Sequence, residues 1–379
     1  MQNHEGRVSG ALAAVLRDRI ARTGPISVAD FMALALTHPQ HGYYAACTPF
    51  GRTGDFTTAP EISQVFGELT GLWCVVVWQA MGRPAPVSLC ELGPGRGTLM
   101  ADARRAQARA DPAFIEAARL HLVEVSPILR KHQRDALATA GPGSQAHWHD
   151  DLATVPEGPL LLIANEFFDA LPVHQFVRTD SGWCERCVGL ADAFGAGDPD
   201  LAFVDVPLPA PPVLPAGLAD VGPGSIVERR PAADALITAI ARRVCRHGGA
   251  ALIVDYGYSE SAPGDSLQAV RGHAFHPVLT RPGEADLTAH VDFAALARAA
   301  TEAGAAVFGP VPQGVWLTRL GAAERARALL ADATPEQAMA ITTGIRRLTH
   351  PQHMGLLFKA MAVSAPGLPP PPGFDSPAP

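Results

Sequence analysis

The sequence predicts an α/β fold: a mostly parallel sheet of seven strands with helices on both faces, a helical N-terminal lobe and an insertion after the fourth strand. Two observations predict it. From residue 87 onward, short apolar runs alternate with helical segments, and this order builds a parallel sheet covered by helices. The first apolar run ends in a cluster of glycines that leads into a helix, as is typical of ligand-binding strand ends.

The composition fits a large α/β protein and argues against several other classes. Of 379 residues, 47% are hydrophobic and 18% are charged, so the chain can bury a sizeable core. A net charge of -7 disfavours a nucleic-acid binder, which is normally basic. We predict no membrane span and no signal peptide. Because the scattered cysteines suit a reducing compartment, we expect a cytoplasmic protein, and the Ala-, Arg- and Pro-rich composition indicates a bacterial one.

Residues 1–86 are interpreted as the helical lobe. Apolar residues at helical spacing predict a first helix, residues 29–37 a second, and residues 58–82 a longer third that begins with a cap, a proline and an acid. The Gly- and Thr-rich loop before this third helix has no period, and such loops are often functional. We expect it to fold over a ligand or to act as a structured connection between lobes. Its polar candidates are Asp55, Thr57, Thr58, Glu61 and Gln64.

Residues 87–363 are predicted to form the sheet domain, with an insertion at about 173–226. The strands are expected in the sequences VSLCEL, LHLVEVSP, AHWHDDL, GPLLLIANEFFDALP, GGAALIVDYGY, AAVFGPVPQGVWLTRL and MGLLFKAMAVS. A hairpin with its turn at Asp180-Ser181-Gly182 carries Cys184 and Cys187, which we interpret as structural thiols because no second pair completes a metal site. We predict no metal site, and a disordered Pro-rich tail over 364–379.

The glycines at the first strand end have the spacing of a particular kind of ligand site. Gly93, Gly95 and Gly97 form G-x-G-x-G behind Glu91, whereas a dinucleotide site has G-x-G-x-x-G. A carboxylate at Glu91 would repel a pyrophosphate and suits a cationic ligand. No Lys-Ser/Thr pair follows, so a phosphate-binding Walker loop is excluded. The alternative is a tight turn that binds nothing.

Acidic residues also follow the next two predicted strands. Glu124 ends the second strand, where an acid can accept hydrogen bonds from ribose hydroxyls. Asp150 or Asp151 ends the third and suits an adenine amino group. Parallel strands bring their carboxyl ends to one edge, so these acids and the glycines are expected to meet there. Thr98, the first residue of the helix after the glycines, joins the predicted site.

The E-x-G-x-G-x-G pattern resembles motif I of class I S-adenosylmethionine-dependent methyltransferases. The longer stretches GRTGDFTTAPEISQVFGELTG, ELGPGRGTLM, NEFFDALPVHQF, VDYGY and PGEADLTAHVDF together resemble the MidA family, over about residues 24–363. The resemblance implies a Rossmann-like methyltransferase fold with S-adenosylmethionine as cofactor. For the family's mitochondrial members, which are complex I assembly factors, it implies symmetric dimethylation of an arginine on a complex I subunit. Ser266 stands where the family pattern has threonine, and GHAFHPVL is less typical.

The segment after the fourth strand is the catalytic candidate. Asn165, Glu166 and Asp169 supply a carbonyl and two carboxylates, and Phe167 an aromatic face, which together could hold an arginine guanidinium. The alternative is a helix start in which Asn165 is the cap and the two acids lie in the first turn. Further polar candidates follow the fifth strand and lie in DLTAHVDF; they are Asp255, Tyr256, His290 and Asp292.

Three functions remain open at this point. The first is a protein arginine methyltransferase whose substrate is an arginine-bearing protein, such as a complex I subunit. The second is a methyltransferase of small molecules, and the third is a non-catalytic assembly factor that binds S-adenosylmethionine. A homodimer is also an open alternative. A nicotinamide-dependent oxidoreductase is excluded by the glycine spacing.

Overall fold

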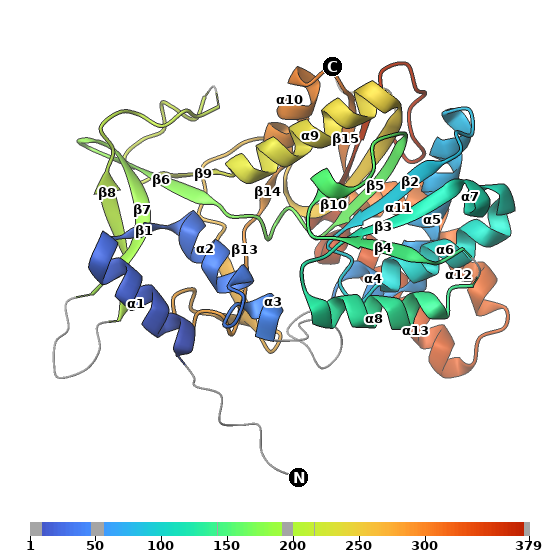
Figure 1. The fold of residues 1–379 in the computed structure, drawn as a ribbon, viewed down its shortest axis with the longest axis horizontal. Helices are drawn as coiled ribbons and strands as arrows, with labels where there is room; N and C mark the ends of the chain where they lie inside the picture. The colour runs from blue at the N-terminus through green and yellow to red at the C-terminus, as the bar shows by residue number, and fades with distance from the viewer. Residues whose placement is uncertain (1–9, 47–56, 142, 192–199, 216, 375–379) are drawn as a thin grey trace, which may run out of the picture. The chain divides into compact units, whose positions relative to one another are not determined.

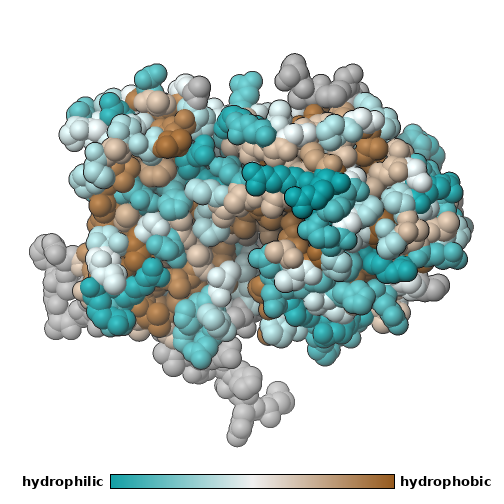
Figure 2. Space-filling model, turned by 45° about the horizontal axis from the view of Figure 1, so that its top comes forward, coloured by the Kyte–Doolittle hydropathy of each residue, from teal (hydrophilic) through white to brown (hydrophobic). Residues whose placement is uncertain are grey.

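The computed structural model describes residues 10–46, 57–141, 143–191, 200–215 and 217–374 (Figure 1). The chain divides into two units. The sheet unit consists of residues 57–169, 233–260 and 291–379, and the companion unit of residues 1–56, 170–232 and 261–290. No helix in the described ranges is long and apolar enough to cross a membrane. Figure 2 shows hydrophilic and hydrophobic residues intermixed over the visible surface.

The sheet unit contains the predicted mostly parallel sheet. Its seven main strands lie in the order β15-β16-β10-β5-β2-β3-β4, and β14 pairs with the end of β10. Only β16 among them runs antiparallel to its neighbours, β10 and β15. The strand bounds are β2 Val87–Leu92, β3 Ala118–Val123, β4 Ala146–His149, β5 Leu160–Asn165, β10 Gly249–Tyr258, β14 Val291–Asp292, β15 Ala306–Pro312 and β16 Phe358–Ser364.

Helices cover both faces of this sheet, as predicted. Figure 1 shows α9 and α10 on one face and α5 and α6 on the other. Strands β2 and β5 are buried along their whole length, as expected of strands covered on both sides. The helices of the unit are α4 Ala59–Ile62, α5 Gln64–Ala80, α6 Thr98–Ala110, α7 Pro112–Ala117, α8 Pro127–Ala138, η1 Leu152–Thr154, α9 Pro231–His247, α10 Phe293–Glu302, α11 Gln313–Arg319, α12 Ala322–Leu330, α13 Pro335–Thr349 and η2 Pro351–Gly355.

Two predicted elements have different bounds in the structure. The single helix expected over 58–82 is divided into α4 and α5 at Ser63, whose backbone is extended and whose hydroxyl accepts a hydrogen bond from Val65 N at 3.3 Å. The strand expected over 305–320 ends at Pro312, and α11 follows at once. In both places a local cap or proline interrupts an apolar pattern that periodicity alone reads as continuous.

The described residues before 87 are mostly helical, as predicted, but those up to residue 46 belong to a companion unit of mixed α/β structure with its own core. Strands β1, β7, β6, β9 and β8 form one sheet and β12, β11 and β13 another. The hairpin of β6 and β7 turns at Asp180-Ser181 as predicted, and Cys184 and Cys187 are buried free thiols. The bounds are α1 Ala11–Thr23, β1 Ile26–Ser27, α2 Val28–Thr37, α3 Tyr43–Ala46, β6 His174–Thr179, β7 Gly182–Leu190, β8 Leu201–Pro207, β9 Ile226–Arg229, β11 Gln268–Arg271, β12 Ala274–His276 and β13 Asp286–Thr288.

The boundary between the units differs from the predicted one at residue 86. Helix α5 belongs to the sheet unit because it packs closely on α6: a Cβ added at Gly71 would lie 2.6 Å from Ala103 Cα. The predicted insertion at 173–226 corresponds to 170–232. A second segment, 261–290, also joins the companion unit, and no local sequence pattern predicted this.

The tail is ordered over most of the stretch predicted to be disordered. Ser364 ends β16, and Phe374 is buried in the main core of the sheet unit. Arg319 Nη1 donates a hydrogen bond to Gly373 O at 3.3 Å. The prediction of disorder was therefore wrong for 364–374, because one aromatic residue anchors a Pro-rich segment. Residues 375–379 lie outside the described ranges.

Candidate active site

The glycine loop between β2 and α6 requires residues without a side chain. Gly93, Gly95 and Gly97 have φ of 57°, 53° and 82°, in the left-handed region that glycine adopts without strain. A Cβ added at Gly93 would lie 2.7 Å from Phe167 Cδ2, and one at Gly97 would lie 3.0 Å from Gln133 Cα. The loop therefore presents bare backbone at the carboxyl end of β2, next to the N-terminus of α6.

Glu91 is a buried acid at this strand end. It lies within β2 with 3% of its surface exposed, and its Oε2 atom has no hydrogen-bond partner among the residues that the structure describes. Burial raises the pKa of Glu91 to about 8. A buried carboxyl group without a partner is costly, so the position favours a ligand that brings a positive charge.

Glu124 lies directly after β3, as predicted. Its Oε1 accepts a hydrogen bond from Ser126 N at 2.8 Å, and its Oε2 accepts one from Gln133 Nε2 at 3.1 Å. Burial raises the pKa of Glu124, and the hydrogen bond from Ser126 opposes this shift. The carboxylate is thus fixed in orientation at the strand end next to the glycine loop.

Gln133 on α8, which was not among the residues predicted from the sequence, connects the glycine loop with two neighbouring strands. Its Nε2 donates to Gly95 O at 2.8 Å as well as to Glu124, and its Oε1 accepts from Trp148 Nε1 at 2.7 Å. The side chain is fully buried. A signal was present, since Gln133 interrupts the apolar stripe of Leu129 and Leu137 at helical spacing.

The two aspartates after β4 already have protein partners. Asp150 is largely exposed and pairs with Arg130, whose Nε donates to Glu124 O at 2.7 Å. Asp151 caps the short helix η1 by accepting a hydrogen bond from Ala153 N at 2.8 Å. The cap gives Asp151 a structural role, and Asp150 is the more accessible of the two.

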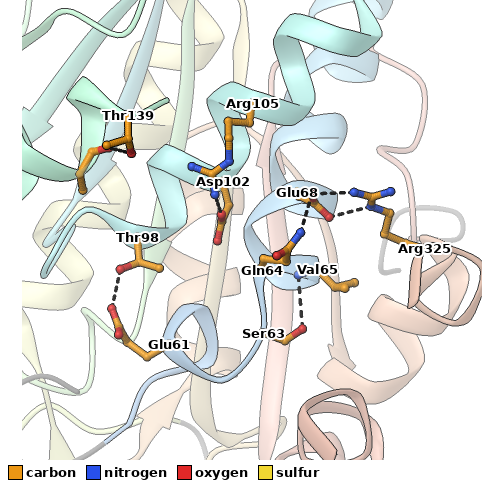
Figure 3. A network of polar contacts seen from close by, with 11 residues as sticks. Glu61, Ser63, Gln64, Val65, Glu68, Thr98, Asp102, Arg105, Thr139 and Arg325 are labelled. Atoms are coloured by element: carbon orange, nitrogen blue, oxygen red, sulfur yellow. Dashed lines mark hydrogen bonds and ion pairs between the residues drawn. The ribbon is translucent and has the colours of Figure 1, made fainter. Parts of the chain in front are cut away.

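Helix α4 contributes a carboxylate to the start of α6. Figure 3 shows the Thr98 hydroxyl directed at Glu61, to which it donates a hydrogen bond at 2.5 Å. Arg96 Nη1 lies 3.5 Å from the same carboxylate. Thr58 is buried at the start of α4, where its carbonyl oxygen accepts from Glu61 N at 3.0 Å. Asp55, the other predicted ligand from this loop, lies outside the described residues.

Glu166 is held in a strained conformation at the end of β5. Its φ is 49°, which is uncommon for a residue with a side chain and occurs often at functional sites. Its Oε1 accepts hydrogen bonds from Ala59 N at 2.9 Å and from Asn165 Nδ2 at 3.3 Å. Burial raises the pKa of Glu166 to about 7, and the nearby Asp169 adds to the shift.

Asp255 shapes the segment that contains Glu166. Its Oδ2 accepts hydrogen bonds from the backbone N atoms of Phe167, Phe168 and Asp169 at 3.2, 3.0 and 3.2 Å. The segment is therefore a turn wrapped around Asp255, and the alternative of a helix start is wrong. Burial raises the pKa of Asp255, and the charges of Asp169 and Glu166 raise it further. The three neighbouring acids, Glu166, Asp169 and Asp255, favour the binding of a cation at this turn.

The remaining polar candidates have structural contacts. Tyr256 packs against Phe358 with ring centroids 5.3 Å apart. Asp292 caps α10 by accepting from Ala295 N at 2.9 Å. In the companion unit, His290 N donates to the Ser266 hydroxyl at 2.9 Å, so the serine supplies the hydroxyl expected of threonine.

Residues 69–311 match the family described as "Putative S-adenosyl-L-methionine-dependent methyltransferase". The chain belongs to this family. The methyltransferase fold and the cofactor class expected from the sequence are thereby confirmed, and the enzyme uses S-adenosylmethionine. The bare glycine loop and the unpartnered Oε2 of Glu91 fit this cofactor, which carries an ammonium group and no phosphate.

Similar proteins support the assignment over nearly the whole chain. The methyltransferase is 40% identical to the protein arginine methyltransferase NDUFAF7 homolog of Drosophila melanogaster, over 93% of this chain and 85% of that protein. It is 37% identical to human protein arginine methyltransferase NDUFAF7, over 91% and 81%. A solved Burkholderia thailandensis protein, described as a "likely methyl transferase" and bound to S-adenosyl-homocysteine, is 29% identical with a TM-score of 0.82, over 96% and 94%.

Proposed function

We propose that the methyltransferase is a protein arginine N-methyltransferase. The observation that carries the proposal is the group of three acids, Glu166, Asp169 and Asp255, at the carboxyl ends of β5 and β10. Phe167 in the same turn contacts the glycine loop at Gly93, so the acids lie beside the cofactor loop. An acidic group suits a guanidinium, which is charged at any ordinary pH. The names of the similar mitochondrial proteins support the same substrate class.

In this proposal the cofactor is held by the glycine loop and by residues at the carboxyl ends of β2, β3 and β4. The Glu91 carboxylate pairs with the methionyl ammonium, and the backbone of Gly93, Gly95 and Gly97 allows the methionyl group to approach closely. Glu124 accepts hydrogen bonds from the ribose hydroxyls. Asp150 accepts one from the adenine amino group, because Asp151 is already engaged as the cap of η1. Thr98, Thr58 and Asp55 are the further proposed contacts from α6 and the loop before α4.

The chain's own groups then position the acceptor. S-adenosylmethionine supplies an activated methyl group when it is bound. Glu166 and Asp169 hold the guanidinium by paired hydrogen bonds, which localise its charge on two nitrogens and leave the third facing the methyl group. The protein contributes mainly alignment and electrostatics. Asn165, whose Oδ1 is buried without a partner among the described residues, can accept a hydrogen bond from the same guanidinium.

Gln133 is expected to matter for cofactor binding. Gln133→Met keeps the length of the side chain but leaves Gly95 O, Glu124 Oε2 and Trp148 Nε1 without their partner. Each unsatisfied group costs about 1–3 kcal/mol, so we expect the Kd for S-adenosylmethionine to rise about tenfold or more. Calorimetric titration measures this, with His132→Gln on the same helix as control. An unchanged Kd in the folded variant would show that Gln133 does not position the site.

The pH dependence should report Glu166. Because its pKa is raised to about 7, the carboxyl group is largely protonated below pH 7 and cannot pair with a guanidinium. We expect kcat/KM for an arginine peptide, at saturating cofactor, to fall about tenfold per pH unit below 7 and to level off above it. Because the pKa of Glu166 is raised, this fall in kcat/KM occurs above pH 5, in a range where a glutamate of ordinary pKa is already ionised. A flat profile between pH 5.5 and 8 would contradict the role of Glu166.

The substrate protein is proposed at two levels. An arginine-bearing protein follows from the acids of the site, and a subunit of respiratory complex I follows from the family resemblance, with the chain acting in a bacterial cytoplasm. Incubation with S-adenosylmethionine and either arginine peptides or free amines separates the alternatives. Methylation of peptides alone supports the proposal, whereas methylation of small amines alone would indicate a small-molecule enzyme. Cofactor binding without transfer to either would indicate an assembly factor.

A further inference from the structure

A cavity of about 520 Å³ lies on one face of the sheet unit. It is formed by the segments that precede β2 and β5 and by side chains of β2, β3 and β4. None of the residues of the glycine loop, nor Glu91 or Glu124, lines it. The lining residues are Pro84, Ala85, Pro86, Ser88, Arg119, His121, His147, His149, Pro156, Glu157, Gly158 and Pro159.

The strand register places polar residues together on the face that forms the cavity. Ser88 of β2 lies opposite Arg119 of β3, and His121 of β3 lies opposite His147 of β4. His149 lies two residues further along β4, and alternate residues of a strand share a face. Strands covered on both faces are normally apolar, and the other face at β2 and β3, with Leu89, Leu120 and Leu122, follows that rule. His121, which is buried on β3, is an exception to this rule, whereas His147 and His149 lie on the edge strand β4, which is only partly buried.

The histidines contact one another directly. His121 Nδ1 lies 3.0 Å from His149 Nε2, and the rings of His121 and His147 stack with centroids 5.5 Å apart. The other nitrogen of His149, Nδ1, lies 3.0 Å from the Thr154 hydroxyl. The bases are thus held at fixed positions on the cavity wall.

The positive charge around the cavity has little compensation within the described chain. Arg243 of α9 donates hydrogen bonds to Val155 O at 3.1 Å and to Pro156 O, and its Nε is buried without a partner among the described residues. Arg119 Nη1 donates to Glu116 O, a carbonyl, at 2.8 Å. Glu157 is the one acid in the lining, and its Oε2 lies 2.5 Å from His247 Nε2. Most of the basic side chains around the cavity therefore have no carboxylate partner among the described residues.

Another part of the cavity lining is apolar. It consists of Pro84, Ala85, Pro86, Pro156 and Pro159, which offer rigid surfaces and, except for Ala85, no backbone donor. A lining that combines prolines with basic side chains suits a ligand that has an apolar body and one anionic end, since binding pockets combine apolar linings with a few placed polar groups.

We propose that this cavity binds a small organic carboxylate, with the carboxylate against Arg119, His121 and His149, and the apolar body against the prolines. The site is separate from the glycine loop and does not depend on the proposed arginine substrate. The available volume is sufficient for a ligand about the size of an aromatic acid.

Binding of the carboxylate should be coupled to proton uptake. Burial and the neighbouring His149, His147 and Arg243 lower the pKa of His121 to about 4, and burial with His147 and Arg130 lowers the pKa of His149. An anion raises both pKa values again, so affinity increases as pH falls, by about tenfold per pH unit for each proton taken up. The groups that face the two rings are Cys90 on β2, Arg119 on β3, His147 on β4, Arg130 on α8, Arg243 and His247 on α9, and Glu157 before β5.

The test is calorimetric titration of the full chain with benzoate, with its neutral isostere benzamide, and with inorganic phosphate, at pH 6 and pH 8. We expect benzoate to bind at pH 6 with net proton uptake, measured in two buffers of different ionisation enthalpy, and at least tenfold more weakly at pH 8. Benzamide and phosphate should each bind at least tenfold more weakly than benzoate at pH 6. No benzoate binding, equal binding of benzamide, or tighter binding of phosphate would overturn the proposal, whatever the variants show.

Variants locate the binding. Arg119→Gln and His149→Gln should each weaken benzoate binding at least tenfold at pH 6, whereas His132→Gln, a histidine outside the cavity in the same unit, should leave it unchanged. Retained S-adenosyl-homocysteine binding shows that each variant is folded. If His149→Gln does not fold, His147→Gln at the exposed edge of the cavity replaces it. Benzoate affinity that is unchanged in the folded Arg119→Gln and histidine variants would place the binding elsewhere and overturn the assignment.

Discussion

Glu166→Gln is expected to lower kcat for an arginine peptide by about 100-fold or more, with the Kd for S-adenosylmethionine changed by less than about threefold. Removal of one preorganised electrostatic contact in an active site typically costs this much. Glutamine keeps the oxygen that accepts hydrogen bonds from Ala59 N and Asn165 Nδ2, so the turn should retain its shape. The loss then reflects the missing negative charge, which a guanidinium needs.

Glu116→Gln is the matched control for this variant. Glu116 is exposed on α7 and lies outside the proposed site, so its kcat should equal that of the unaltered enzyme. Radiolabelled methyl transfer measures kcat, and calorimetry measures cofactor binding. If Glu166→Gln turns over at the normal rate, Glu166 does not hold the acceptor, and the acidic turn must have another function.

Gly95→Val is expected to abolish cofactor binding, with the Kd for S-adenosylmethionine raised by at least about 100-fold. Gly95 has φ of 53°, where a β-branched residue is strained by about 1–3 kcal/mol. Its carbonyl accepts from Gln133 Nε2, so a shifted backbone also disturbs the residue that orients Glu124. The added side chain projects from a loop that the ligand must approach closely.

Gly82→Val is the control that distinguishes the effect of backbone strain from the effect of a lost cofactor site. Gly82 has φ of 83° and open space around its position, so valine there imposes a similar backbone strain far from the loop. We expect both variants to be destabilised to a similar extent in thermal denaturation and only Gly95→Val to lose the cofactor. Normal cofactor affinity in folded Gly95→Val would contradict the assignment of the glycine loop.

The parts predicted well from the sequence are those set by short-range patterns. Apolar runs bounded by glycine or proline located the strands, because parallel strands buried on both faces are continuously apolar. The same logic placed Glu91, Glu124 and Glu166 at strand ends, where the structure has them. Asp255 was named separately from Glu166, and their proximity follows from the register of β10 with β5, which a sequence does not display.

The parts that were missed depend on tertiary contacts. Segment 261–290 joins the companion unit through its core, in which Leu287 packs, and no local signal marks that destination. The Pro-rich tail is ordered up to residue 374 because Phe374 is buried in the core of the sheet unit. Gln133 is recognisable in the sequence as a polar residue in an apolar stripe. Its three partners could not be predicted, because they come from separate segments of the chain.

The acidic turn beside the glycine loop is proposed to hold a protein arginine for methylation. The most direct measurement is to incubate the enzyme with methyl-labelled S-adenosylmethionine and a set of arginine-bearing proteins, and then to hydrolyse the products and separate the amino acids. With the unaltered enzyme the label is expected in methylated arginine, and with Glu166→Gln the rate at which this label appears should fall by about 100-fold or more. Label in any other amino acid, or no protein label while the cofactor binds, would contradict the claim.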